Sequence, residues 1–290
     1  MLPAAADPVG PPAGSVGEPH TDPAPVPVRP MQFRELLDLP FALIQARIST
    51  FAAVFGVAVA VAAGISVGVT VFVSLATGDS DSGTFWGALL TTLIAAWVLR
   101  LFVRGVTVPI GLAVVHRQPM TWQQAVIQLS AAAGPLLSYQ AMYTLIGVGV
   151  LAIGTPLMFT APFAVVWLLW LRGRRFATVP AIFDESTGYR IGTQRSKLLT
   201  AGTQWQLVGV LLYLRGLLLV LIVPLLALPQ FAAGITGTRR WAVTVLLITA
   251  ALLFVALAEL VESATQVIAY VDRRCRREGW DIKIPAEDRP

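Results

Sequence analysis

Five charged side chains whose types and spacing could do chemistry stand within otherwise apolar stretches of this chain. They are Arg100, Arg104, Arg215, Glu259 and Glu262. The two glutamates are three residues apart, so they share one face of a helix. Charged groups surrounded by hydrocarbon can relay protons, line a substrate path or hold a charged headgroup. The alternatives are a buried ion pair that only fixes the register of the helices, or arginines that extend to the membrane surface.

The depth of these charges in a membrane predicts which of them pair. On a straight helix from residue 241, Glu259 lies about 27 Å from the start, at a rise of 1.5 Å per residue. Arg215 lies about 16 Å from the start of the stretch at residue 204 by the same arithmetic. An isolated ion at such a depth costs several kcal/mol, so it finds a partner inside the bundle. We therefore predict that one of the two glutamates forms an ion pair with Arg100 or Arg215.

The composition places most of the chain in a membrane. Hydrophobic residues make up 56% of the sequence and charged residues only 13%, with a mean hydropathy of +0.72. A soluble domain has about a quarter charged residues. Cys275 is the single cysteine, which excludes an intramolecular disulfide, and His20 and His116 are the only histidines. The sequence contains no G-x-S-x-G or H-E-x-x-H motif. We therefore expect no enzyme activity, no metal site and no cofactor.

Six apolar stretches approach the length needed to cross the bilayer, which is about 20 residues for 30 Å of hydrocarbon. They cover residues 50–77, 85–107, 136–153, 156–173, 204–228 and 241–270. The third and fourth are short and joined only by the turn "IGTP", so they could form a re-entrant pair instead of two crossings. The pattern predicts an all-α, polytopic bundle of about six transmembrane helices.

Three amphipathic segments, each before a pair of spans, are predicted to lie in the membrane interface. The first is residues 31–50, "MQFRELLDLPFALIQARIST", which we expect to bend near Pro40. The second is "TWQQAVIQLSAAAG", in which Thr121 and Gln124 have the spacing of a capping box. The third is "GYRIGTQRSKLLTAG".

The remaining segments predict the domain limits and the orientation. Residues 1–30 are rich in proline and alanine and are expected to be disordered. Residues 31–272 form the membrane bundle, and residues 273–290 form a basic, then polar, tail. Arginine and lysine are concentrated on the side of both termini, which the positive-inside rule assigns to the cytoplasm. The 19 arginines and 2 lysines resemble the usage of a high-GC bacterium. We thus expect a multi-pass protein of the bacterial inner (plasma) membrane.

Seven basic side chains are expected to contact anionic lipid at the cytoplasmic surface, at about 1 kcal/mol per charge. They are Arg190, Arg195, Lys197, Arg273, Arg274, Arg276 and Arg277. Nucleic acid is not an expected partner, because no element that could enter a groove accompanies these residues.

Two segments resemble a bacterial integral-membrane family, the membrane domain found alone or fused to glycerophosphoryl diester phosphodiesterases. The stretch "PAIFDESTGYRIGTQRSKLLTAGTQWQLVGVLL" is similar to the family's acidic stretch and following "RS-hydrophobic-L-t-G-x-W" pattern. The matching residues are Arg195, Ser196, Leu198, Leu199, Gly202 and Trp205. The chain departs from the pattern at Lys197 and at Thr203–Gln204. The resemblance spans most of residues 31–283 and implies a six-helix membrane bundle without the phosphodiesterase barrel or its hydrolase activity.

Two functions remain open on the sequence alone. The first is a non-enzymatic accessory or scaffold protein, whose amphipathic helices contact anionic lipid, a membrane protein partner or a second copy of the chain. The second is a transporter or lipid-handling protein that uses the intramembrane glutamates and arginines.

Overall fold

The computed structural model describes residues 26–154, 160–236 and 240–283, and these ranges contain helices but no strand. The predicted disorder of residues 1–25 lies outside the described residues, whereas Val26 is buried in the core. The helices, in chain order, are α1 (Phe33–Ala46), α2 (Ile48–Ala76), α3 (Asp81–Val115), α4 (Trp122–Ala131), α5 (Ala133–Gly154), α6 (Ala161–Arg174), α7 (Thr178–Asp184), α8 (Tyr189–Thr200), α9 (Gln204–Thr236), α10 (Arg240–Glu278) and α11 (Trp280–Lys283).

Five helices of the described chain, α2, α3, α5, α9 and α10, are long and apolar enough to cross a membrane. The predicted fourth span, residues 156–173, corresponds to α6, which has 14 described residues and a length of about 21 Å. Residues 155–159, which join α5 to α6, lie outside the described residues. The all-α fold is as predicted, and the five long apolar helices among the described residues indicate a membrane-embedded protein.

The surface of α2 shows why these helices need lipid around them. One stripe, which includes Phe55, Val59 and Ala63, is buried against the bundle. The other faces expose apolar side chains, such as Ile65 at 61% and Phe72 at 72%. A contiguous apolar surface of this kind is rare in water-soluble monomers. Such a surface is suited to contact with the hydrocarbon chains of a membrane.

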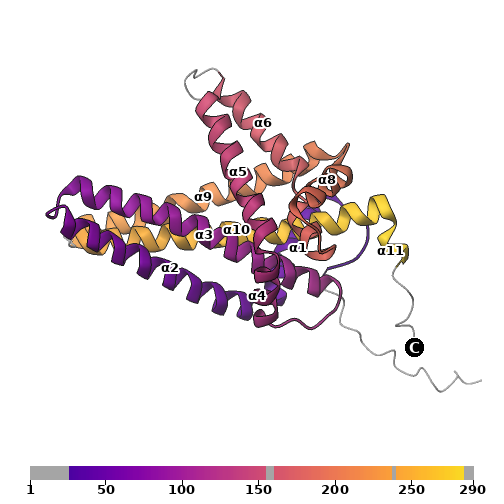
Figure 1. Cartoon of the computed structure of the whole chain (residues 1–290), viewed down its shortest axis with the longest axis horizontal. Helices are drawn as coiled ribbons and strands as arrows, with labels where there is room; N and C mark the ends of the chain where they lie inside the picture. The colour runs from indigo at the N-terminus through magenta and orange to yellow at the C-terminus, as the bar shows by residue number, and fades with distance from the viewer. Residues whose placement is uncertain (1–25, 155–159, 237–239, 284–290) are drawn as a thin grey trace, which may run out of the picture.

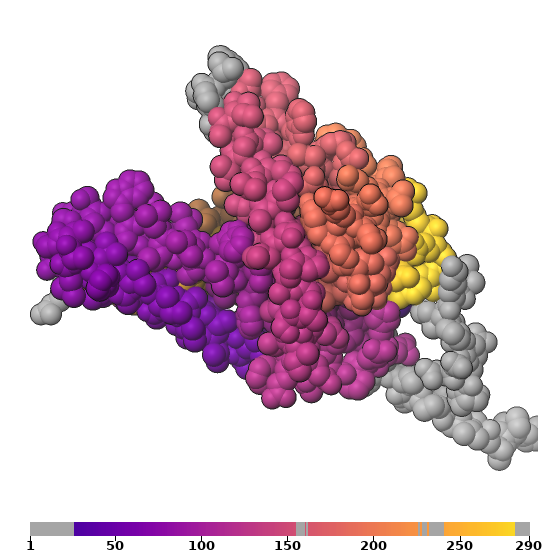
Figure 2. All heavy atoms as spheres, viewed as in Figure 1, coloured from indigo at the N-terminus to yellow at the C-terminus, as the bar shows by residue number. Residues whose placement is uncertain are grey.

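Helices α3 and α10 form the centre of the bundle, and α2 packs against both (Figure 1). Their backbones approach closely at Gly111 of α3, where an added Cβ would lie 3.2 Å from a methyl of Val267. Helix α9 lies along α10, and α6 packs on α9. The hairpin of α5 and α6 rises away from the arm formed by α2 and α3 (Figure 2). The bundle is therefore splayed at one end and joined at the other.

Two long helices exceed their predicted limits. Helix α3 continues through Pro109, which removes one helical hydrogen bond, because its residues from Val103 to Ala113 are buried among other helices. Helix α10 continues past residue 270 to Glu278, where Gly279 adopts a φ of +58° and its N–H donates to the carbonyl of Cys275. A glycine in this left-handed conformation is a common helix terminator. The residues predicted to begin a tail at 273 are therefore the last turns of α10.

The three predicted amphipathic segments form α1, α4 and α8 at the end of the bundle opposite the α2–α3 turn (Figure 1). The predicted capping box of α4 is present, since Thr121 Oγ1 accepts from the N–H of Gln124 at 3.3 Å. Helix α1 continues through Pro40 to Ala46, and Arg47, with a φ of −134°, separates it from α2. The short helix α7 was not predicted.

Candidate functional site

The five intramembrane charges predicted from the sequence meet in the described structure. Helix α3 contributes Arg100 and Arg104, which are one helical turn apart. Helix α10 contributes Glu259, whose side chain is 1% exposed. Its Oε2 accepts from Nε of Arg100 at 2.8 Å, and its Oε1 accepts from Nε of Arg104 at 2.6 Å. One buried carboxylate thus holds two arginines, and its pair with Arg100 is one of the predicted alternatives.

The second glutamate makes a weaker contact with α9. Glu262 Oε2 accepts from Nη2 of Arg215 at 3.3 Å, and the Arg215 side chain is 35% exposed. The same nitrogen lies 3.5 Å from the hydroxyl of Tyr143 on α5. Arg215 is therefore less tightly engaged than Arg104, whose side chain is 2% exposed.

Helices α5 and α6 bring four further side chains that the sequence analysis did not assign to this cluster: Tyr139, Gln140, Tyr143 and Arg172. Gln140 Oε1 accepts from Nη1 of Arg104 at 3.0 Å. The guanidinium of Arg104 lies 5.2 Å from the ring centre of Tyr139, and that of Arg172 lies 4.0 Å from the ring centre of Tyr143. The signal that could have found them is the spacing of Tyr139, Gln140 and Tyr143, which face one side of an apolar span.

A cavity of about 350 Å³ opens between α3, α9 and α10 beside this cluster. Its polar wall consists of Arg100, Arg215, Glu259 and Glu262, and its apolar wall of Leu218, Leu219, Ile222, Phe254, Val255 and Ala258. On α9 the apolar residues follow Arg215, and on α10 they precede Glu259. Because consecutive helices α9 and α10 run in opposite directions, these residues lie on the same side of the charges. The cavity therefore has a charged end and an apolar end.

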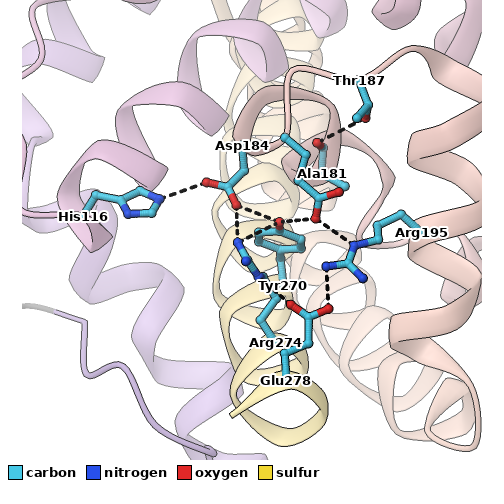
Figure 3. Close-up of polar contacts among 9 residues, drawn as sticks. His116, Ala181, Asp184, Thr187, Arg195, Tyr270, Arg274 and Glu278 are labelled. Atoms are coloured by element: carbon cyan, nitrogen blue, oxygen red, sulfur yellow. Dashed lines mark hydrogen bonds and ion pairs between the residues drawn. The ribbon is translucent and has the colours of Figure 1, made fainter. Parts of the chain in front are cut away.

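A second polar cluster ties α3, α7, α8 and α10 together at the joined end of the bundle (Figure 3). The carboxylate of Asp184 lies 2.9 Å from Nε2 of His116 and accepts from the hydroxyl of Tyr270 at 2.8 Å and from Arg274. Burial raises the pKa of Asp184, but the hydrogen bonds from His116 and Tyr270 and the charge of Arg274 outweigh it, so the pKa lies below 3.8.

The basic side chains predicted to contact lipid are mostly engaged within the chain. Arg195 pairs with Glu185 at 2.7 Å and also with Glu278. Arg274 also pairs with Glu278, and the side chain of Arg273 is 2% exposed. Two more donate hydrogen bonds to backbone carbonyls: Arg276 to that of Met31 and Arg277 to that of Ala201. Two of the seven, Arg190 and Lys197, are exposed on α8 without such contacts in the described structure.

Comparisons of the chain with protein-family models, with curated proteins and with solved structures find no match. The resemblance to the phosphodiesterase-associated membrane domain therefore remains a prediction from the sequence.

Proposed function

We propose that this membrane protein binds an anionic amphiphile in the cavity between α3, α9 and α10, as part of lipid handling or transport. The observation that carries the proposal is the order in which charged and then apolar side chains line the cavity. Arg100 and Arg215 stand at its charged end, and the apolar side chains of α9 and α10 continue from there along the spans. A lipid has the same order, with a charged headgroup followed by acyl chains.

The chemistry of the wall supports binding rather than catalysis. Its ionisable groups are two arginines and two glutamates, and each glutamate accepts a hydrogen bond from an arginine. Arginine binds phosphate and carboxylate oxygens in a planar, two-point arrangement. A nucleophile with an adjacent base, which covalent catalysis requires, is not present among the residues that line this cavity. We therefore propose a non-enzymatic protein.

The test is native mass spectrometry of the protein in nanodiscs that contain zwitterionic lipid and a minor fraction of anionic lipid. We expect anionic lipid to remain bound to the wild type and to Arg117→Gln, and to be lost from Arg215→Gln. Arg117 is the matched control because it is an exposed arginine in the loop after α3 and belongs neither to the cavity wall nor to the predicted lipid contacts. Equal retention by both variants would show that the cavity is not the binding site.

The exposed face of α8 favours a second candidate function, the accessory or scaffold role. Arg190 and Lys197 are exposed beside Ile191 and Leu198, which are 59% and 65% exposed. A face that mixes basic and apolar side chains suits the headgroup region of an anionic membrane, and it also suits a membrane protein partner or a second copy of the chain. We expect the double variant Arg190→Ala, Lys197→Ala to bind anionic liposomes more weakly, in a salt-sensitive way. Binding that is unchanged across salt concentrations contradicts this role.

The orientation remains part of the proposal. We infer that α1, α4 and α8 lie on the cytoplasmic side of a bacterial plasma membrane, together with both termini. The distribution of arginine and lysine supports this arrangement.

A further inference from the structure

The intramembrane cluster carries more positive than negative charge. Its cations are Arg100, Arg104, Arg172 and Arg215, and its anions are Glu259 and Glu262. Four positive and two negative charges leave two positive charges without a carboxylate among the described members of the cluster. Uncompensated charge inside a membrane bundle is costly and marks a functional site.

The excess charge lies on the side of the cluster that faces α6 and α9. Glu259 engages both arginines of α3 at 2.6–2.8 Å, whereas Arg215 reaches Glu262 only at 3.3 Å. Arg172 stacks on Tyr143, acts electrostatically on Glu262, and its buried Nε has no hydrogen-bond acceptor in the described structure. Arg215 and Arg172 therefore have capacity for further acceptor oxygens, and the hydroxyl of Tyr143 lies beside them.

We propose that the ligand of this site is a lipid phosphomonoester, whose headgroup is a phosphate with two negative charges. The proposal rests on the proposed function and names its substrate class. A terminal phosphate has a second pKa of about 6, so it carries close to two charges at neutral pH. A phosphodiester headgroup such as that of phosphatidylglycerol carries one, so it leaves one arginine charge uncompensated. Inorganic phosphate has the charge but leaves the apolar wall of the cavity empty.

The experiment uses the full chain in phosphatidylcholine nanodiscs, doped with equal amounts of phosphatidic acid and phosphatidylglycerol and analysed by native mass spectrometry. We expect roughly tenfold enrichment of phosphatidic acid over phosphatidylglycerol, the ratio that a contact difference of about 1.4 kcal/mol produces. Lowering the pH below about 6 should remove this preference, because the phosphomonoester then loses its second charge. This arm needs no variant and so does not depend on the folding of one.

Variants test whether the excess positive charge of the cluster causes the preference for phosphatidic acid. Arg172→Gln should reduce the ratio toward one while phosphatidylglycerol remains bound, and Arg172→Lys, which keeps the charge, should retain the preference. Arg117→Gln, in the loop after α3, is the control and should behave as the wild type. Thermal unfolding of each variant checks that the fold is kept.

Each other outcome overturns a defined part of the argument. Equal enrichment of the two anionic lipids over phosphatidylcholine rejects the phosphomonoester and leaves the anionic-amphiphile function standing. Enrichment of neither lipid rejects both proposals. Displacement of bound phosphatidic acid by millimolar inorganic phosphate alone would show that the site recognises free phosphate and that the apolar wall does not contribute.

Discussion

Glu259 is the residue on which the charged cluster depends most. It is buried and holds Arg100 and Arg104 through its two oxygens. We expect Glu259→Gln to destabilise the fold by about 3–5 kcal/mol, because removing one member of a buried ion pair leaves the other charge uncompensated. Unfolding of the purified protein in mixed micelles of mild detergent and dodecyl sulfate measures this loss.

Glu262→Gln is the matched control for that change. Glu262 makes one longer contact, to Arg215 at 3.3 Å, whereas Glu259 holds two arginines at 2.6–2.8 Å. We expect a smaller loss than for Glu259→Gln, because a single, longer hydrogen bond is removed. A loss as large as that of Glu259→Gln would mean that the two carboxylates act as one unit.

The lowered pKa of Asp184 leads us to expect that the stability of the fold depends on pH. Because its folded-state pKa lies below 3.8, the carboxylate stabilises the fold above that pH, and the contribution is lost as the pH falls through the folded-state pKa. We expect Asp184→Asn to be less stable at neutral pH and to lose less further stability on acidification than the wild type. Thermal unfolding at neutral pH and below pH 3.8 measures both effects.

The exposed Asp38→Asn on α1 is the control for Asp184→Asn. The stability of this variant should fall on acidification as much as that of the wild type. If Asp184→Asn and the wild type lose stability in parallel on acidification, the hydrogen bonds from His116 and Tyr270 do not set the charge of Asp184.

At the residue scale, the sequence was sufficient to predict that the intramembrane charges pair, but not which of them do or all of their neighbours. A charge in an apolar span must find a partner, so an ion pair between one of the glutamates and Arg100 or Arg215 follows from solvation. Arg172 stands near Arg174 and Arg175 at the end of a short apolar span, and no spacing in the sequence links it to the cluster. Its stacking on Tyr143 depends on how α6 lies against α5, which no local pattern specifies.

At the element scale, the N-terminus of α4 is set by Thr121. Its hydroxyl accepts from the N–H of Gln124, and the Gln124 side chain accepts from the N–H of Thr121 at 2.8 Å. We expect Thr121→Ala to destabilise this helix by roughly 1 kcal/mol, and Thr121→Ser to keep most of that stability. Amide hydrogen exchange of residues 122–125 measures the local effect. Equal exchange in both variants would show that packing, not the cap, determines where α4 begins.

Elements with a strong local signal were predicted well, and their ends were not. The apolar runs and the amphipathic period predicted the positions of α2, α5, α8 and α9. Helix α10 extends beyond its apolar run because Arg273, Arg274 and Arg276 have partners within the fold, so they need no exit into water. Helix α7 has seven residues, and the backbone N–H of Ala177, which precedes it, donates to the hydroxyl of Ser196 on α8. Such a tertiary contact is invisible to periodicity.

At the scale of the whole molecule, the proposed orientation can be tested with single cysteines. In a Cys275→Ser background, we expect Asp79→Cys in the α2–α3 turn to react with a membrane-impermeant maleimide added to intact cells. Lys197→Cys on α8 should react only after the cells are opened. Reaction of Lys197→Cys alone from the outside would reverse the assignment of the termini to the cytoplasm, and reaction of both would reject it.

The overall packing is what the sequence could not supply. Hydropathy predicts spans but not which of them touch, and the central pair, α3 and α10, is brought together by contacts between residues more than 150 positions apart. The splay of α5 and α6 away from α2 likewise depends on long-range packing (Figure 1).

The distance along the chain between Arg104 and Glu259 also has a consequence for biosynthesis. The two residues are 155 positions apart, which at about 5–20 residues per second separates their synthesis by roughly 8–30 s. During that interval α3 occupies the translocon or the bilayer with its arginines unmatched. The synthesis of α10 therefore completes the neutralisation of a much earlier helix, α3. A nascent chain truncated before α10 leaves Arg100 and Arg104 without the carboxylate that they share in the complete fold.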